Sequence, residues 1–535
     1  MAIPKLVPRE AYKMLEAVVG PENISEDPAV VDGYVWQYGA EWLGDPKVGT
    51  KFLPYTPGAV VLPKTTEEVQ GILKVCNRFK LMSKAFSTGW GHKSSVSRDG
   101  AIQIDLRRMN RILDIDEKNM IAVIEPYVCG AQLVAELWKR GLNFNIIGAG
   151  PNCSILASVT SMMGIGYNNL SMGYNDRNAL GVEWVLPTGD VLRLGSLGSG
   201  AGWICGDGPG PSLRGIMRAT MGAMGGLGVF TKCAIKLYHW AGEATLPIRA
   251  IGEAPRYTWE EGAGIPENMD IIHLSFPNLE KVSDAIWKMG EAEIGYAAGS
   301  FDRYLMMLGT GRYNADRVML IENDIPDILP KYAFTLLLVC NSREQLEYER
   351  KVRNEIIASC GGEIYRLEPE IQSFLFLLML QGSSLPTKFV FGQTGSFHPT
   401  LVGNFVTRHT LGPAHQISWD MKKPYAEKGL ILSDKGEGGW GCSMDYSHVA
   451  YLENESMYNP NDLNSGKAWL EMSAKTNKEV VDKHLFFPIY GQRHIAYPKS
   501  THEYCGPFLH NYHIWQKKVK EALDPNTASD PETYV

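Results

Sequence analysis

Residues 86–95 read Phe-Ser-Thr-Gly-Trp-Gly-His-Lys-Ser-Ser, a polar loop with two glycines between a short apolar run and the strand-like segment Ala101–Leu106. Glycine lets the backbone reach positive φ, so successive N–H groups can turn inward, and serine and threonine hydroxyls add donors. Such a loop can hold an anion such as a pyrophosphate largely by its main chain. A glycine-rich loop by itself is a weak signal for a phosphate site, so the segments on either side of it decide the interpretation.

The elements around this loop predict a mixed α and β domain. Gly58–Pro63 is predicted to be a short apolar strand. Thr65 followed by Glu67 and Glu68 is the N-capping pattern of a helix that packs on one face. After about residue 240, strands such as Ala333–Val339 alternate with helices. We therefore predict an α+β protein whose second domain has an antiparallel sheet. The last ten residues are expected to be a mobile tail.

Composition is that of a globular protein. The chain has 535 residues, 44% hydrophobic and 21% charged, with a net charge of -7 and no clustered Lys and Arg, so a nucleic-acid surface is not expected. The sequence shows no signal peptide and no apolar run of membrane-span length, which predicts a cytoplasmic protein. Nine cysteines without CxxC spacing predict neither disulfides nor a metal site.

Several motifs follow one another along the chain, and their order is more specific than any one of them. Val60–Pro63, the glycine loop, Ile104–Leu106, Met109–Ile112 and Glu125–Val128 come first. Ser154–Val159, Gly164–Tyr167, Val182–Leu192, Gly208–Pro211 and Gly225–Lys232 come next. Over roughly residues 55–240 this order resembles the flavin-binding half of the vanillyl-alcohol oxidase and p-cresol methylhydroxylase family, and weaker similarity continues to Asp524-Pro525-Asn526.

The resemblance implies a two-domain fold of the p-cresol methylhydroxylase type. Residues 1–240 would form the FAD-binding domain, with its core at about 55–240. Residues 241–485 would form a substrate-binding cap domain with an antiparallel sheet. Residues 486–535 would return to the FAD-binding domain, and the protein would form a homodimer or larger oligomer.

The resemblance also places the cofactor. The FAD pyrophosphate would lie on the glycine loop, and the adenine would lie near Gly228 and Val229. The second flavin stretch, Ser154–Val159 with Gly164–Tyr167, would lie along the flavin. The implied cofactor-binding residues are Ser87, Thr88, Gly89, Trp90, Gly91, His92, Lys93, Ser94, Ser154, Ser158, Thr160, Gly164, Gly166, Gly228 and Val229.

In phenol-oxidising members of the family, tyrosines and an arginine stabilise the substrate as a phenolate, which favours hydride loss from the para-alkyl carbon. The matching C-terminal stretch here contains Tyr490, Arg493, His494 and Tyr497, all able to bind an oxyanion. These four are the first catalytic candidates. His448 falls near the position where some members tether the flavin covalently, so it is a candidate for a tether or a base; whether FAD is attached covalently stays open.

The sequence departs from the phenol-oxidising members of the family at two places, and these differences leave the substrate open. The loop is shorter than in the phenol oxidases and offers Trp90 and His92 where a phenolate-binding tyrosine is expected. The turn Gly148–Cys153 lacks the carboxylate expected beside the flavin. Another group must then act as acid or base, or the substrate differs.

Three functions remain in view. The first is an FAD-dependent oxidase or dehydrogenase for an aromatic alcohol or 4-alkylphenol. The second is a D-2-hydroxy-acid dehydrogenase, which shares the flavin domain, although the metal-binding signatures of that group are not visible. The third is a noncatalytic flavoprotein subunit that passes electrons within a complex. The electron acceptor is open among O2, a cytochrome and an iron–sulfur partner.

Overall fold

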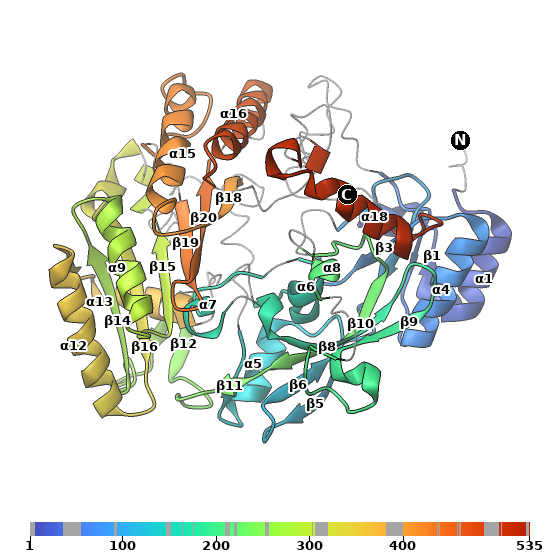
Figure 1. The fold of residues 1–535 in the computed structure, drawn as a ribbon, viewed down its shortest axis with the longest axis horizontal. Coiled ribbons are helices and arrows are strands. Elements are labelled where there is room, and N and C mark those ends of the chain that lie inside the picture. The colour runs from blue at the N-terminus through green and yellow to red at the C-terminus, as the bar shows by residue number, and fades with distance from the viewer. Residues whose placement is uncertain are drawn as a thin grey trace.

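The computed structural model describes residues 6–35, 55–89, 94–145, 151–162, 164–173, 175–208, 214–218, 222–251, 256–301, 303–304, 319–320, 322–380, 400–435, 437, 439–456, 458–459, 462–485, 502–503, 506–530 and 534. These residues form two sheet-centred halves side by side (Figure 1), with the N-terminal segment and the C-terminal helix in the same half. Within the described residues, no helix is long and apolar enough to cross a membrane.

The first half contains two sheets. The first sheet has the order β1 (Ile24–Ser25), β2 (Ala59–Val61), β4 (Ile102–Asp105), β3 (Ser83–Phe86), with β2, β4 and β3 parallel. The second sheet is antiparallel, with the order β5 (Ile112–Asp116), β6 (Ile121–Ile124), β10 (Val229–Lys236), β8 (Ala179–Val185), β9 (Val191–Leu194). A short pair, β7 (Leu142–Asn143) and β11 (Tyr238–His239), follows them.

Helices cover both sheets of this half. The first sheet packs with α1 (Arg9–Val19) and α4 (Thr66–Phe79), and the second with α5 (Gly130–Trp138) and α6 (Ile155–Thr160). The predicted N-cap of helix α4 is present, because the Thr65 side chain accepts a hydrogen bond from the Glu68 amide at 3.2 Å. Smaller helices are α2 (Pro28–Asp32), α7 (Asn169–Met172) and α8 (Arg214–Arg218).

The second half is built on a seven-stranded antiparallel sheet. Its order is β17 (Glu363–Tyr365), β14 (Met269–Ser275), β16 (Ala333–Val339), β15 (Ala297–Phe301), β19 (Gly439–Met444), β20 (Val449–Glu455), β18 (Thr400–Val406). A separate hairpin pairs β12 (Ile248–Ile251) with β13 (Arg256–Trp259). The predicted antiparallel cap sheet is therefore present.

The two faces of the cap sheet have different neighbours. One face packs against α9 (Leu279–Glu291), α12 (Arg343–Ser359) and α15 (Leu411–Ala426), and α16 (Leu463–Asp482) packs on α15. The opposite face packs against α13 (Pro369–Leu380) and against Tyr167 of the first half. This second face therefore meets the other domain.

The expectation of a mobile C-terminal tail is wrong for its described residues. Helix α18 (Tyr512–Leu523) leads into a segment that packs on the first half, and Ala528, Ser529, Asp530 and Tyr534 are each at most 2% exposed. A polar terminal segment is typical of a mobile tail, but this one is ordered because its backbone pairs with Ser83 at the edge of β3.

Candidate functional site

The glycine loop begins where two parallel strands end. Phe86 closes β3 opposite Asp105 of β4, and Ser87, Thr88 and Gly89 follow. Gly89 has φ +78°, and a Cβ there would lie 2.9 Å from the Phe86 ring, so the loop needs a glycine at this turn. Trp90, Gly91, His92 and Lys93 lie outside the described residues.

Gln103 of β4 anchors the far side of this loop. Its side-chain Nε2 donates to the carbonyl of Lys84 at 3.1 Å and to that of Ser94 at 3.2 Å. The residue is fully buried, and its Oε1 has no hydrogen-bond partner among the described residues. A buried polar atom without a partner calls for a ligand or water beside it.

The second predicted flavin stretch lies directly against the loop. The Ser154 amide donates to Thr88 Oγ1 at 3.0 Å, which joins two motifs that are 66 residues apart. Ser154 also caps α6 by accepting from the Ala157 amide, and its own hydroxyl donates to the Pro126 carbonyl. The structure thus brings these two predicted motifs together.

Ser158 and Thr160 lie inside α6, and their hydroxyl protons are already used. Ser158 donates to the Ser154 carbonyl at 2.7 Å and Thr160 to the Leu156 carbonyl at 2.9 Å. Each hydroxyl oxygen keeps acceptor capacity. Gly164 and Gly166 follow in an irregular segment in which the Gly164 amide donates to Ser158. The cofactor contacts of these four residues stay predictions.

Gly228 and Val229 lie at the start of β10, where packing explains the glycine. Gly228 has φ +84°, and a Cβ would lie 2.2 Å from the Val185 carbonyl oxygen. Its amide donates to Ser529 Oγ at 2.8 Å, and Val229 is 1% exposed. Adenine contact at these two residues stays a prediction.

Sequence reasoning missed Gly222, which lies against the end of α6. It has φ +119°, and a Cβ would lie 2.4 Å from the Ser161 carbonyl carbon. The next two amides, of Ala223 and Met224, donate to the Thr160 and Ser161 carbonyls. The run Met221-Gly222-Ala223-Met224-Gly225-Gly226 was the available signal, since its glycines permit close backbone approach.

A cluster of aromatic residues joins the two domains. Tyr167, which follows Gly166, is fully buried and inserts against Gly299 of β15, where a Cβ would lie 2.4 Å from its ring. Trp440 Nε1 donates to the Tyr167 hydroxyl, and the Trp440 ring is 5.4 Å from both the Tyr167 and the Tyr451 rings. We call Tyr167, Trp440 and Tyr451 the aromatic wall.

Two buried carboxylates lie on the same strand face as Tyr451. Glu453 and Glu455 follow it at two-residue intervals in β20, and they are 8% and 6% exposed. Burial raises the pKa of Tyr167 well above its ordinary value, and the charges of Glu455 and Glu453 add to that rise. Tyr167 is therefore a neutral phenol. The alternation in Val449–Glu455 was the signal for these carboxylates, but only the tertiary fold shows which face meets the other domain.

Other buried polar atoms near the interface also lack partners. Both side-chain atoms of Asn169 and the Oδ1 of Asn145 have no hydrogen-bond partner among the described residues. With Gln103 they provide donors and acceptors of the kind that a large polar cofactor can satisfy. The residues present therefore fit FAD.

The predicted catalytic residues are placed only in part. Tyr490, Arg493, His494 and Tyr497 lie outside the described residues, so their roles stay predictions. His448 is exposed in the turn between β19 and β20, where its amide donates to the Asp445 carbonyl. This turn contacts α7 through the Asp445 and Tyr446 amides, and the tethering role of His448 stays a prediction.

Comparison with known protein families identifies an FAD-binding domain in the first half of the chain. Residues 57–195 match the family model described as FAD binding domain. The flavoprotein subunit of 4-cresol dehydrogenase (hydroxylating) from Pseudomonas putida is 28% identical over 252 residues, which is 45% of this chain and 46% of that protein. A probable mitochondrial D-lactate dehydrogenase from Danio rerio is 25% identical over 264 residues, or 48% and 46% of the two chains. The aligned stretches thus span about half the length of these relatives.

Solved structures match over the whole chain. A 4-ethylphenol oxidase from Gulosibacter chungangensis superposes with a TM-score of 0.73 at 18% identity, covering 100% of this chain and 98% of that one. A substrate-bound p-cresol methylhydroxylase gives the same TM-score and coverage at 17% identity. At this identity the likeness concerns the fold.

The chain is therefore a flavoprotein: it carries an FAD-binding domain, and FAD is its cofactor. Its fold is the two-domain fold of the p-cresol methylhydroxylase type, which confirms the predicted resemblance and fold class.

Proposed function

We propose that the protein is an FAD-dependent oxidoreductase acting on an aromatic alcohol or a 4-alkylphenol. The aromatic wall carries this proposal, because it places three buried rings where the cap sheet meets the FAD-binding domain. Aromatic rings pack edge to face with other rings, so such a wall favours an aromatic substrate. The whole-chain likeness to a 4-ethylphenol oxidase agrees with this reading.

Bound FAD supplies the hydride acceptor, and the protein supplies orientation and electrostatics. We propose that Tyr490, Arg493, His494 and Tyr497 bind the substrate oxygen by charge and hydrogen bonds. Glu453 and Glu455 are candidates for the acid or base that the turn Gly148–Cys153 does not provide. The neutral Tyr167 would orient the ring rather than take a proton.

A D-2-hydroxy-acid dehydrogenase is the second candidate. Relatives named as a D-lactate dehydrogenase and a glycolate oxidase subunit from Bacillus subtilis match at 25% identity over similar lengths. Each match covers less than half of this chain, and the matching family model describes only FAD binding, so these relatives do not choose between the substrate classes.

Anaerobic reduction of the purified flavin separates these candidates. We expect bleaching of the flavin absorbance by 4-ethylphenol or vanillyl alcohol, and none by D-lactate or glycolate. Reduction only by the hydroxy acids would establish the second candidate, and no reduction by either class would favour an electron-transfer subunit. Reoxidation of the reduced protein by O2, by a cytochrome or by an iron–sulfur protein then identifies the acceptor.

Substitution of the proposed oxyanion-binding residues tests their role. Tyr490→Phe and Arg493→Met should each lower kcat with the phenol at least tenfold, since each removes a group that stabilises developing charge. FAD content should stay at the wild-type level. Tyr348→Phe, at a tyrosine that is 61% exposed on α12, is the matched control and should leave kcat unchanged. Full activity in both variants would remove these residues from the site.

A further inference from the structure

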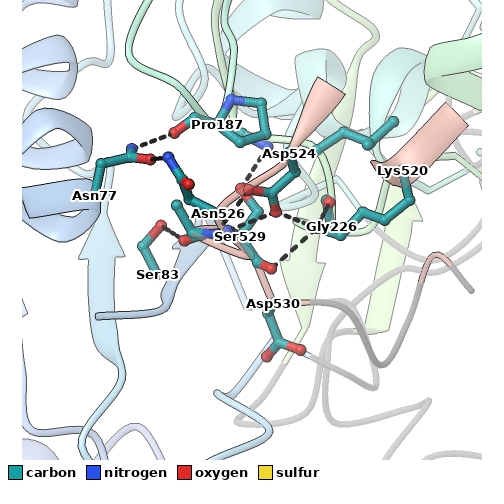
Figure 2. Close-up of polar contacts among 12 residues, drawn as sticks. Asn77, Ser83, Pro187, Gly226, Lys520, Asp524, Asn526, Ser529 and Asp530 are labelled. Atoms are coloured by element: carbon teal, nitrogen blue, oxygen red, sulfur yellow. Dashed lines mark hydrogen bonds and ion pairs between the residues drawn. The ribbon is translucent and has the colours of Figure 1, made fainter. Parts of the chain in front are cut away.

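The segment Asp524–Asp530, which we call the C-terminal clamp, lies along the outer edge of β3 (Figure 2). Ser83 and Ser529 form a parallel bridge. The Ser83 amide and hydroxyl both donate to the Ala528 carbonyl at 2.8 Å, and the Asp530 amide donates to the Ser83 carbonyl at 3.0 Å. The clamp therefore adds a short strand beside the strand that leads into the glycine loop.

Two buried charges give the clamp its shape. Asp524 accepts hydrogen bonds from the Ala528 amide at 2.7 Å and the Ser529 amide at 3.0 Å. The Lys520 ammonium donates to Asp524 and to the carbonyls of Gly226 and Ser529, so its three protons all have acceptors. Lys520 and Asp524 are 6% and 4% exposed. The clamp is thus a defined turn tied to the glycine segment before β10.

Asp530 connects the clamp to both sides of the glycine loop. Its carboxylate accepts from the Ser97 amide at 2.8 Å and from the Ser97 hydroxyl at 2.5 Å, just after the loop. It also lies 3.7 Å from the ammonium of Lys84, on the strand before the loop. The neighbouring Ser529 accepts from the Gly228 amide. Two consecutive residues therefore contact the residues on both sides of the glycine loop and the glycine segment predicted to bind the adenine.

We propose that the C-terminal clamp sets the affinity of the FAD site, with Asp530 as the positioning residue that fixes the two ends of the glycine loop. This proposal rests on the assignment of that loop to FAD. A loop whose ends are already fixed loses less conformational entropy when it binds its ligand. Binding is also reciprocal, so FAD should hold the clamp in place as the clamp holds the loop.

FAD titration of apoprotein from riboflavin-starved cells tests the proposal. We expect Asp530→Ala to raise the Kd for FAD at least tenfold, and Asp530→Asn and Ser97→Ala to raise it by smaller factors. Asn526→Ala is the matched control, because Asn526 is exposed on the same clamp and bonds only to Asn77 of α4 in the described structure. Its Kd should stay within twofold of wild type.

A second measurement distinguishes positioning from general support. Amide hydrogen exchange at residues 524–530 of the wild-type protein should slow when FAD is added to the apoprotein. A folded Asp530→Ala protein with wild-type affinity would overturn the proposal, as would unchanged exchange on FAD binding. If Asp530→Ala does not fold, the Ser97→Ala protein decides by the same criterion. Wild-type protein that binds no FAD would instead overturn the cofactor assignment itself.

Discussion

At the scale of single residues, Glu183 of β8 shows how a buried charge stabilises the FAD-binding domain. Its carboxylate accepts hydrogen bonds from Thr66 at 2.8 Å, Thr231 at 3.2 Å and Lys232 at 2.8 Å, and Arg193 lies at 3.3 Å. Burial alone would raise its pKa, but Lys232, Thr66 and Arg193 together lower it below the ordinary value. Glu183 therefore favours the folded state when ionised.

Glu183→Gln should lower stability at pH 7 by about 1–2 kcal/mol, since a buried charged acceptor is lost and Lys232 is left without it. A carboxyl whose folded pKa is depressed contributes its full stability above its unfolded pKa and loses it as pH falls through the folded pKa. The difference between variant and wild type should therefore shrink from pH 7 toward pH 3. Urea unfolding at both pH values measures it.

The control for this change is Glu136→Gln, which alters an exposed pair with Lys139. Such surface pairs contribute little, so the control should unfold at the wild-type urea midpoint at both pH values. A Glu183→Gln protein as stable as wild type at pH 7 would contradict the assigned role.

At the scale of elements, α6 depends on one residue that serves two purposes. Ser154 caps the helix, and its amide also bonds Thr88 of the glycine loop. The sequence marks the capping signals of α4 clearly, because Thr65 and Glu68 lie close together in the chain. The contact between Thr88 and Ser154 needs the tertiary fold, so the motif order predicted the two loops but not their bond.

Ser154→Ala should lower stability by about 1 kcal/mol through the lost cap. Alanine keeps the amide that bonds Thr88, but it lacks the hydroxyl that bonds the Ala157 amide and the Pro126 carbonyl, so this segment loosens and FAD binding should also weaken. Ser342→Ala is the matched control. Ser342 caps α12 in the cap domain by accepting from the Gln345 amide, so its loss should cost similar stability and leave the Kd for FAD unchanged. Equal FAD affinity in both variants would show that α6 acts only structurally.

At the scale of the whole molecule, the two domains are joined by side chains far apart in sequence. Tyr167 and Trp440 are separated by 273 residues, and Gly299 provides the space for the tyrosine ring. Local patterns predicted the antiparallel cap sheet, since strand and helix periods are short-range signals. They could not predict which sheet face meets the FAD-binding domain, nor that the polar tail is ordered, because both depend on long-range pairing.

Gly299→Ala should destabilise the protein by about 1–3 kcal/mol, because the new Cβ would overlap the rigid Tyr167 ring. Gly412→Ala, in α15, has open space around the added carbon and should be neutral or stabilising by up to about 1 kcal/mol. Thermal unfolding of both variants measures the contrast. A Gly299→Ala protein that melts at the wild-type temperature would show that the domains do not depend on this insertion.

The pairing of Ser83 with Ala528 across 445 residues has a consequence for biosynthesis. A ribosome makes β3 and the glycine loop early, but their edge partner is made only after the whole cap domain. The first half therefore cannot complete its sheet edge while the cap is still being translated. Newly made protein should acquire its flavin only after residues 524–530 have emerged from the ribosome, and nascent chains that stop before residue 524 should leave β3 with an exposed edge that invites association with other chains.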